Sequence, residues 1–412
     1  MKKKPVGCSR RAFFKAAGAA GVGAVLGPLP AGAKTYRNNI EHLLATGQAK
    51  VPTRPFGQSG VQVSILSLGG MFDIAANQLM LRQALRWGVT YWDTADCYQS
   101  GSEAGIGKYF AKYPRDREKV FLVSKSDARD PDGMTRLLDR SLKRMKTDYI
   151  DLYFVHGVSY IDELNDDTRK WAEKAKAQKK IKLFGFSTHS NMEKLLSRAP
   201  DLGYIDGIMM TYNFRNMYKP GMKAAVAACV QAGIGLTAMK TQAGRSWMSM
   251  SKADKSAEQL MDAFVQKGFT QEQAKLKAVW TNTGIAAICS QMPNMTILKA
   301  NVAAAVDDTP LTSEQIRLFQ QHAVATSDQY CTGCGHICEA AVKGRVPISD
   351  IMRYHMYCQS YGRPDWARAH FQAIPSGIRN RICAVDFREA ERLCPQNMPI
   401  ARLMHRAVKA FG

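Results

Sequence analysis

The chain has 412 residues, of which 46% are hydrophobic and 22% are charged. This length and composition suit one large domain with a smaller one, and they exclude an intrinsically disordered or collagen-like chain. The formal net charge is +22, and six basic residues lie in residues 1–33, which contain no acid. The remaining basic residues are spread along helical stretches without an aromatic stacking platform, so nucleic acid is not an expected partner.

The N-terminal 33 residues resemble a twin-arginine export signal. Arg10 and Arg11 precede a weakly apolar run over 16–26, and a small-x-small cleavage site follows, ending at Ala33. We expect cleavage after Ala33 and a periplasmic location, with the twin-arginine export machinery as a partner. Because this route carries folded proteins, the signal also predicts a cofactor that is inserted before export. No later stretch reaches the roughly 18 consecutive apolar residues of a spanning helix, so no integral membrane segment is expected.

From about residue 51 to 320, short β-branched or aromatic runs alternate with longer helical patterns. The predicted strands, in chain order, are 64–70, 91–95, 120–125, 150–156, 183–188, 207–213, 235–240 and 286–291. Regular alternation of strand and helix implies parallel strands, and eight such units over about 250 residues predict an α/β fold, the (β/α)8 TIM barrel. We assign residues 34–50 to a leader and residues 51–325 to this barrel.

Polar side chains follow consecutive predicted strands, at the end where such a barrel carries its chemistry. Asp93 and Tyr98 follow the second strand, Lys125 ends the third, and His156 ends the fourth. Further motif residues are Arg54-x-Phe56-Gly57, Gly101-Ser102-Glu103, Gly185-Phe186-Ser187-Thr188-His189 and Tyr212-Asn213. In this order and context, the residues are similar to the aldo-keto reductase pattern over nearly the whole barrel.

The resemblance implies a catalytic tetrad of Asp93, Tyr98, Lys125 and His156. Reducing a carbonyl adds hydride to carbon and builds charge on oxygen, so a proton donor must stand beside that oxygen. The resemblance gives this role to Tyr98. Lys125 is expected to lower the pKa of the Tyr98 phenol, Asp93 to hold Lys125, and His156 to polarise the oxygen of a small carbonyl or alcohol substrate.

The resemblance also implies a nicotinamide dinucleotide, because no side chain can donate a hydride. The family's cofactor positions correspond to Ser187, Thr188, Tyr212, Met239, Lys240, Gly244, Arg245, Asn294 and Asn301. Near Met239 and Lys240 the usual nicotinamide-stacking aromatic is missing, and Met209 replaces a carboxamide-holding glutamine. The loop after the eighth strand has no lysine or arginine placed for a 2′-phosphate, so NADP and NAD both remain candidates.

Ten cysteines occur, and three of them form a C-x2-C-x3-C cluster at Cys331, Cys334 and Cys338. Cys394 precedes a proline, and three clustered cysteines with a remote Cys-Pro look like a ferredoxin-type site. We therefore predict one [4Fe–4S] cluster in a small, mainly helical, ferredoxin-like module over residues 326–412.

Two alternatives remain for these cysteines, namely a zinc ion held by four thiolates and disulfide bonds. His336 is a weaker candidate ligand, because four cysteines already suffice. Cys358 and Cys383 stand outside the motif and are expected to be packing or reserve thiols.

Together these features predict an exported iron–sulfur aldo-keto reductase that transfers hydride between NADP or NAD and a carbonyl or alcohol. The cluster either transfers electrons, with a redox partner protein, or braces the barrel. The alternative is a non-catalytic periplasmic binding or electron-transfer protein that keeps the barrel without dinucleotide binding. The sequence does not identify the substrate.

Overall fold

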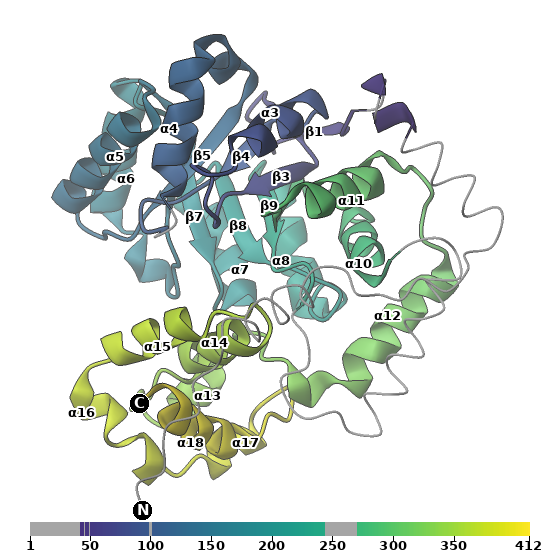
Figure 1. The fold of residues 1–412 in the computed structure, drawn as a ribbon. Helices are drawn as coiled ribbons and strands as arrows, with labels where there is room; N and C mark the ends of the chain where they lie inside the picture. Colours follow the sequence, from purple (N-terminus) through teal and green to yellow (C-terminus); the bar gives the residue numbers. More distant parts are fainter. Residues whose placement is uncertain (1–41, 45, 49, 99–100, 244–269) are drawn as a thin grey trace, which may run out of the picture.

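The computed structural model describes residues 42–44, 46–48, 50–98, 101–243 and 270–412 (Figure 1). The predicted export signal lies outside these residues, as do Gly244 and Arg245. In the predicted leader, Leu44 is buried and its carbonyl oxygen accepts a hydrogen bond from the Trp87 indole. Within the described part of the chain, no helix has the length and apolar character needed to cross a membrane.

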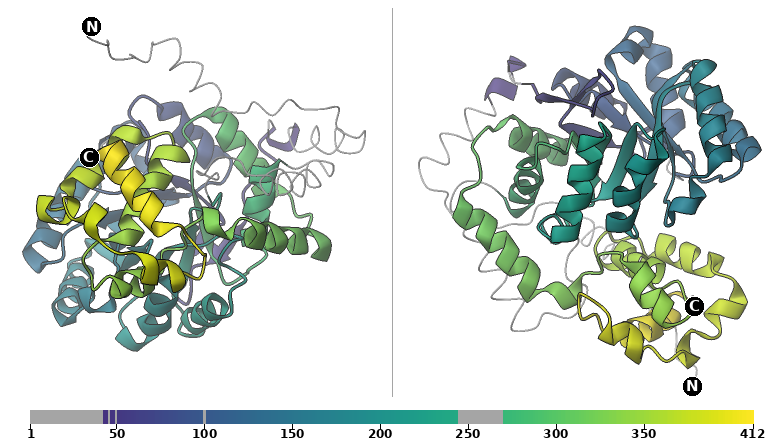
Figure 2. Two further views of the ribbon diagram at one scale, coloured as in Figure 1. Left: turned by 90° about the horizontal axis from the view of Figure 1, so that it is seen from below. Right: turned by 180° about the vertical axis from the view of Figure 1, so that it is seen from behind.

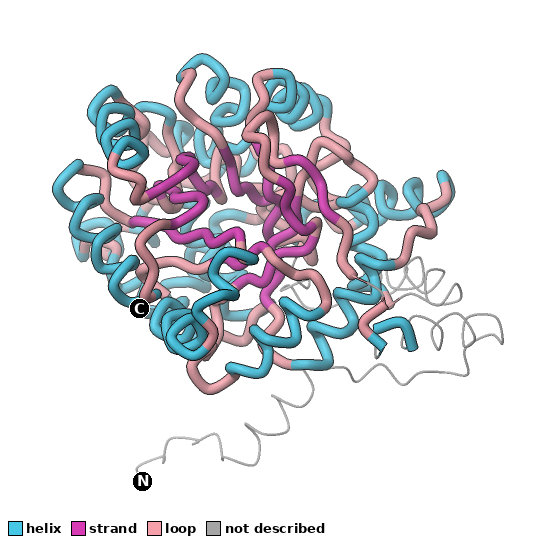
Figure 3. The backbone as a smooth tube through the Cα atoms, turned by 90° about the horizontal axis from the view of Figure 1, so that it is seen from above, coloured by secondary structure: helices cyan, strands magenta, loops and turns pink. Residues whose placement is uncertain are grey.

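Eight parallel strands close into a barrel in the order β10-β3-β4-β5-β6-β7-β8-β9, with helices around them (Figure 3). Their bounds are β3 Leu66–Gly69, β4 Tyr91–Asp93, β5 Phe121–Ser126, β6 Ile150–Val155, β7 Ile181–Thr188, β8 Gly207–Thr211, β9 Gly235–Met239 and β10 Ala287–Gln291. Every residue of β5 and β6 is buried, including the polar Ser124, Lys125 and Ser126 at the end of β5. The prediction of a (β/α)8 barrel is confirmed.

A short antiparallel hairpin closes the barrel end at which the strands begin. It pairs β1 (Thr53–Pro55) with β2 (Gln62–Ser64), and Phe56 beyond β1 is fully buried. A Cβ atom on Gly207 or Gly235, at the starts of β8 and β9, would lie 2.8 or 2.4 Å from the Phe56 ring. The sequence prediction missed this hairpin because it merged residue 64 of β2 with β3 into one strand.

Helices cover the outside of the barrel. They are α3 Gln78–Arg86, α4 Ser102–Lys112, α5 Pro131–Met145, α6 Asp166–Ala177, α7 Met192–Leu202, α8 Pro220–Gln231, α10 Gln271–Trp280, α11 Met295–Val306 and α12 Ser313–Ala325. Side-chain caps define several of their starts. The Asp130 carboxylate accepts from the Gly133 N–H at α5, and Thr270 with Gln273 forms a capping box at α10.

Residues beyond α12 form a helical module with its own buried core, which runs from Cys338 to Phe411. Its helices are α13 Gly335–Ala341, α14 Ile348–Gln359, α15 Pro364–Ala373, α16 Ser376–Arg379, α17 Arg388–Arg392 and α18 Ile400–Phe411. The module lies against one end of the barrel (Figures 1 and 2). Hydrogen bonds from Asn191 after β7 and Asn213 after β8 to this segment identify that end as the one where the strands finish.

Candidate active site

The four residues of the predicted tetrad lie together where β4, β5 and β6 end. The Lys125 ammonium donates to Asp93 Oδ1 at 2.6 Å and to the Thr94 carbonyl oxygen at 2.7 Å. Its Nζ atom also lies 3.4 Å from the Tyr98 hydroxyl oxygen. The rings of Tyr98 and His156 meet edge to face with centroids 6.2 Å apart. The Tyr98 phenol therefore stands beside an ion pair whose side chains are each 2% exposed.

The structure changes one expectation about Tyr98. Burial raises the pKa of the Tyr98 phenol well above its usual value, and the negative charge of Asp93 raises it further. Lys125 was expected to lower this pKa, but its positive charge is compensated by Asp93 at 2.6 Å. Tyr98 therefore keeps its proton through the neutral range, which suits a hydrogen-bond donor and general acid.

Removing one member of the buried ion pair is expected to destabilise the fold. Lys125→Met leaves the Asp93 carboxylate buried without its cation, so the free energy of unfolding should fall by about 3–5 kcal/mol. Denaturant unfolding measures this loss. The double variant Lys125→Met with Asp93→Asn should recover part of it, and a loss below about 1 kcal/mol would contradict the burial of this pair.

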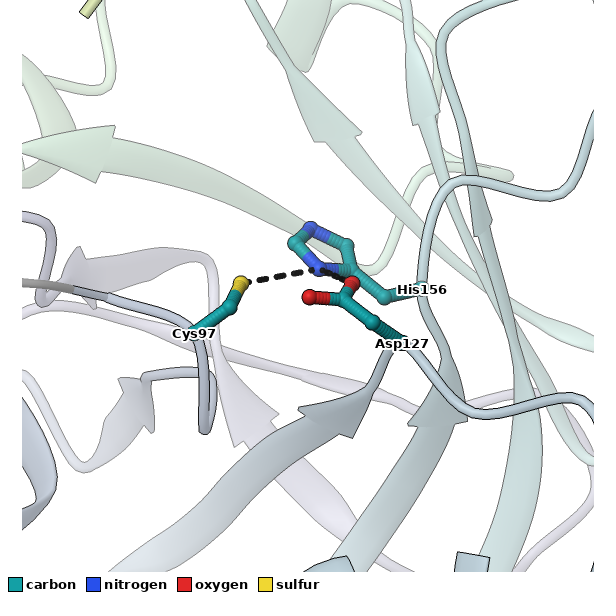
Figure 4. Close-up of side chains that lie close together, drawn as sticks. All are labelled: Cys97, Asp127 and His156. Atoms are coloured by element: carbon teal, nitrogen blue, oxygen red, sulfur yellow. Dashed lines mark hydrogen bonds and ion pairs between the residues drawn. The ribbon is translucent and has the colours of Figure 1, made fainter. Parts of the chain in front are cut away.

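His156 has two neighbours that the sequence did not single out (Figure 4). Its Nδ1 atom lies 2.8 Å from Asp127 Oδ1 and 3.4 Å from Cys97 Sγ. Burial lowers the pKa of His156 below its usual value, so the ring is neutral at pH 7. Their positions in the sequence could have pointed to both residues, because Cys97 directly precedes Tyr98 and Asp127 lies two residues beyond Lys125.

Two predicted cofactor positions, Ser187 and Thr188, are the last residues of β7, and a third, Tyr212, directly follows β8. The Ser187 hydroxyl accepts from the Gly157 N–H at 3.1 Å, and the Thr188 hydroxyl donates to the Ser190 carbonyl at 2.7 Å. Tyr212 is directed elsewhere, because its hydroxyl accepts from the Asn282 amide at 2.8 Å, in the turn before β10. The structure thus brings Ser187 and Thr188 to the strand ends but turns Tyr212 toward the helix layer.

The start of α11 offers a place for phosphate after the eighth barrel strand. Asn294 caps this helix by accepting from the Ile297 N–H, and residues 294–296 are exposed. The first N–H groups of a helix lack intrahelical partners and carry partial positive charge, which suits a phosphate. Asn301, in the same helix, is buried and donates to the Ser290 hydroxyl at 3.0 Å.

Lys240 directly follows β9, in the Met239–Lys240 stretch near which the usual stacking aromatic is missing. Its backbone is left-handed, with φ of 58°, and its Nζ atom lies 4.8 Å from the Tyr361 ring centroid and 5.2 Å from that of Tyr357. Burial and the charge of Arg353 lower the pKa of Lys240 to about 8. Tyr357, Tyr361 and Arg353 of the C-terminal module therefore reach Lys240 at the barrel mouth. No local sequence pattern had indicated this contact.

Comparison with known proteins decides the family. The model for the Aldo/keto reductase family matches residues 67–280, which is more than half of the chain. The chain belongs to the aldo/keto reductase family. It is therefore an oxidoreductase of the aldo-keto reductase type, and the family match ends before the cysteine-rich module.

Relatives of this family member share the barrel to different extents. "Aldo-keto reductase yakc [NADP(+)]" of Schizosaccharomyces pombe is 31% identical over 183 residues, covering 40% of this chain and 51% of the relative. "Uncharacterized oxidoreductase YqkF" of Bacillus subtilis is 26% identical over 299 residues, covering 65% of this chain and 95% of the relative. The solved holo form of an aldo-keto reductase from Bacillus halodurans, at 23% identity, covers 66% of this chain and 96% of that chain with a TM-score of 0.56, which supports the fold.

Outside the family barrel, the four predicted cluster ligands line one pocket. Cys331, Cys334, Cys338 and Cys394 surround it together with apolar residues such as Met352 and Ile400. The described cysteines are all free thiols. Burial and the neighbouring Cys334 raise the pKa of Cys331 to about 12, so the Cys331 thiol keeps its proton at neutral pH.

The cysteine motif is attached directly to the reductase barrel. The Asn191 N–H donates to the Gly333 carbonyl oxygen at 2.6 Å, and the Asn191 side-chain oxygen lies 2.9 Å from both the backbone N and the Nδ1 of His336. His336 therefore contacts the loop after β7 and is not among the residues that line the cysteine pocket. The two cysteines on either side of Gly333 are held against that loop.

Gly333 is expected to be indispensable for this attachment. Its φ is +78°, and a Cβ atom would lie 2.3 Å from the His189 carbonyl oxygen. Gly333→Ala should lower the free energy of unfolding by about 1–3 kcal/mol, as measured by denaturant unfolding. Gly344→Ala is the matched control, because Gly344 also has a positive φ but nothing lies within 4 Å of its Cβ position. Equal losses in the two variants would contradict a close approach at Gly333.

Proposed function

We propose that this aldo-keto reductase transfers hydride between a nicotinamide dinucleotide, NADP or NAD, and a small carbonyl or alcohol substrate. The observation that carries the proposal is the buried contact of Lys125 with Asp93 at 2.6 Å and with Tyr98 at 3.4 Å. A phenol that keeps its proton beside a fixed ammonium can donate a hydrogen bond to a carbonyl oxygen and transfer its proton as charge develops there.

Each residue of the barrel mouth has a separate role in the proposed reaction. Tyr98 supplies the proton, Lys125 supports the charge that the phenol then carries, and Asp93 keeps Lys125 in place. Because Asp127 takes the Nδ1 proton of the neutral His156 ring, Nε2 can only accept a hydrogen bond, and its partner on the substrate side is the hydroxyl of an alcohol. The proton transferred in the reduction therefore comes from a buried group, and Lys125 limits the cost of the transient phenolate.

The described residues fit a dinucleotide at two points. Ser187 and Thr188 at the end of β7 would hold its nicotinamide amide, and the exposed start of α11 at Asn294 would hold phosphate. When bound, the dinucleotide supplies the hydride that no side chain can donate. The Schizosaccharomyces pombe relative is named for NADP(+), which supports NADP for this chain.

We further propose one [4Fe–4S] cluster at Cys331, Cys334, Cys338 and Cys394. A zinc ion held by four thiolates would bring the sulfur atoms to about 3.8 Å from one another. Among the described residues, the four cysteines do not supply a group of three ligand atoms that all lie within 4.8 Å of one another. The C-x2-C-x3-C run with a remote Cys-Pro carries the choice of a multi-iron cluster over a single zinc ion. Burial raises the pKa of Cys334, and the positive charge of Lys219 offsets part of that rise.

The cluster has two possible roles that the geometry supports. Hydride chemistry moves two electrons while a cluster moves one, so the two centres do not couple directly. The bonds from Asn191 to Gly333 and His336 favour bracing of the loop after β7, whereas electron transfer would require a redox partner protein. Anaerobic isolation of the full chain, followed by iron, sulfide and extracted-nucleotide analysis, tests both parts of the proposal.

We also propose that residues 1–33 export the folded chain to the periplasm through the twin-arginine route. Arg10-Arg11 carries this proposal. Replacing both arginines by lysine keeps the charge, so we expect the variant to remain in the cytoplasm with its signal uncleaved. Fractionation of cells, with detection of the uncleaved and cleaved chains, measures the outcome. Unchanged export would contradict the proposal.

A second candidate function is a non-catalytic binding or electron-transfer protein. It is favoured by the missing nicotinamide-stacking aromatic near Met239 and Lys240, and by the contacts of Lys240 with Tyr357 and Tyr361. Under this alternative the cluster-loaded chain binds neither NADPH nor NADH, which separates it from the first proposal.

A further inference from the structure

Three potential metal ligands converge beside the tetrad, and each comes from a different strand end. Cys97 follows β4, Asp127 follows β5, and His156 follows β6 (Figure 4). His156 Nδ1 lies 2.8 Å from Asp127 Oδ1 and 3.4 Å from Cys97 Sγ, and all three ligand atoms lie within 4.8 Å of one another. A thiol, a carboxylate and an imidazole are thus directed at one point.

Without a metal, hydrogen bonds link the three groups through Asp127, which bonds both His156 Nδ1 and the Cys97 thiol. Nδ1 of a neutral ring offers either one proton or one lone pair, so it does not bond Asp127 and Cys97 equally well. A metal ion accepts a lone pair from each of the three groups at once, so one cation between them would replace this chain with three direct bonds.

The spacing suits a zinc-type ion. With Zn–S near 2.3 Å and Zn–N near 2.0–2.1 Å, tetrahedral geometry puts sulfur and nitrogen about 3.5 Å apart. Cys97 and His156 already have this spacing, at 3.4 Å. The carboxylate oxygen would need to move about half an ångström from nitrogen, by the same geometry. The Asp127 side chain is 56% exposed and has the space to move.

We propose that Cys97, Asp127 and His156 bind one divalent transition-metal ion of the zinc type, distinct from the cluster at the other cysteines. Cys97 supplies a thiolate and Asp127 a carboxylate, so together they balance the two positive charges of the ion. The proton of the Cys97 thiol is released to solvent on binding. Three protein ligands leave a fourth position open, as in catalytic zinc sites.

Ligation at Nδ1 also fixes the tautomer of His156. In a neutral ring, an Nδ1–H that donates to Asp127 leaves Nε2 without a proton, so Nε2 cannot donate to a carbonyl oxygen. With the ion on Nδ1, the proton resides on Nε2 and can be donated. This consequence rests on the proposed reductase function, whereas the ion site itself does not.

The test uses the full chain, isolated anaerobically with its iron–sulfur cluster assembled, and titrated with Co²⁺ as the probe. We expect one Co²⁺ per chain beyond the iron of the cluster, with a thiolate-to-cobalt absorption band. Cys97→Ser should remove the band and weaken binding at least tenfold. Asp127→Asn, at a largely exposed side chain, should weaken binding at least tenfold and keep the band. Cys383→Ser removes an exposed thiol elsewhere and should match the unaltered chain.

Two results would overturn the site: no Co²⁺ beyond the cluster, or equal binding in Cys97→Ser, Asp127→Asn and Cys383→Ser. A thiol–carboxylate–imidazole hydrogen-bond chain would then account for the geometry. Because cobalt stoichiometry is measured without nucleotide or substrate, failure of this site is distinguishable from failure of the proposed reductase function. The proposed reductase function is tested separately, by the binding of NADPH and NADH and by the activity of Tyr98→Phe.

Discussion

Tyr98→Phe should lower kcat/KM for carbonyl reduction by about 10²–10⁴-fold, because it removes the proton donor and nothing else of similar acidity replaces it. The hydroxyl of Tyr98 has Lys125 Nζ as its partner, at the long distance of 3.4 Å, so the loss of one oxygen atom leaves the Lys125–Asp93 ion pair in place. Steady-state oxidation of NADPH or NADH with a panel of aldehydes and ketones measures the effect, and the free energy of unfolding should change little.

Tyr109→Phe is the matched control for this experiment. The Tyr109 hydroxyl donates to Asp116 at 2.8 Å within the helix layer, away from the strand ends that hold the tetrad. This variant should lose some stability and keep its activity per folded molecule. Equal activity in Tyr98→Phe and the unaltered chain would contradict the role assigned to Tyr98.

Cys394→Ser should reduce bound iron and sulfide at least tenfold, because Cys394 is the one proposed ligand that comes from outside the 331–338 segment. It lines the same pocket as the other three cysteines, and without it the loop after α17 has no bond to the cluster. Iron and sulfide analysis of anaerobically isolated protein measures the loss. Cys383→Ser, at an exposed cysteine, should keep the full content.

The same Cys394→Ser variant separates the two roles of the cluster. If the cluster braces the barrel, nicotinamide-linked activity and the free energy of unfolding should fall with the iron content. If the cluster transfers electrons, nicotinamide-linked activity should persist while electron exchange with a redox partner is lost. Full iron content in Cys394→Ser would contradict the assignment of this ligand.

The barrel could be predicted because its signals are local. Most of the barrel strands read as short, largely apolar runs between helical patterns, and the rule that the chemistry lies at the strand ends predicts that Asp93, Lys125 and His156 lie together. The β1–β2 hairpin was not predicted from the sequence, because its strands have only three residues each and β2 is followed almost at once by β3. Tyr212 shows the limit of placing a side chain by position alone, since its hydroxyl contacts Asn282 in a distant turn.

The remaining features depend on contacts between segments that are far apart in the chain. Tyr357 and Tyr361 reach Lys240, and Gly333 meets Asn191, only because the C-terminal module docks on the barrel mouth. No periodicity within either segment encodes that docking. The high pKa of Tyr98 likewise follows from burial together with the charge of Asp93, which a list of neighbouring residue types does not reveal.

Titration of the cluster-loaded chain with NADPH and with NADH, followed by calorimetry, tests the central claim most directly. The account predicts one nucleotide per chain, with a dissociation constant in the range of about 1 μM to 1 mM that is usual for enzymes and their substrates. Binding of either nucleotide in this range supports hydride chemistry at Tyr98. Absence of binding for both, in protein that retains its iron and its fold, would contradict the reductase proposal and favour the non-catalytic alternative.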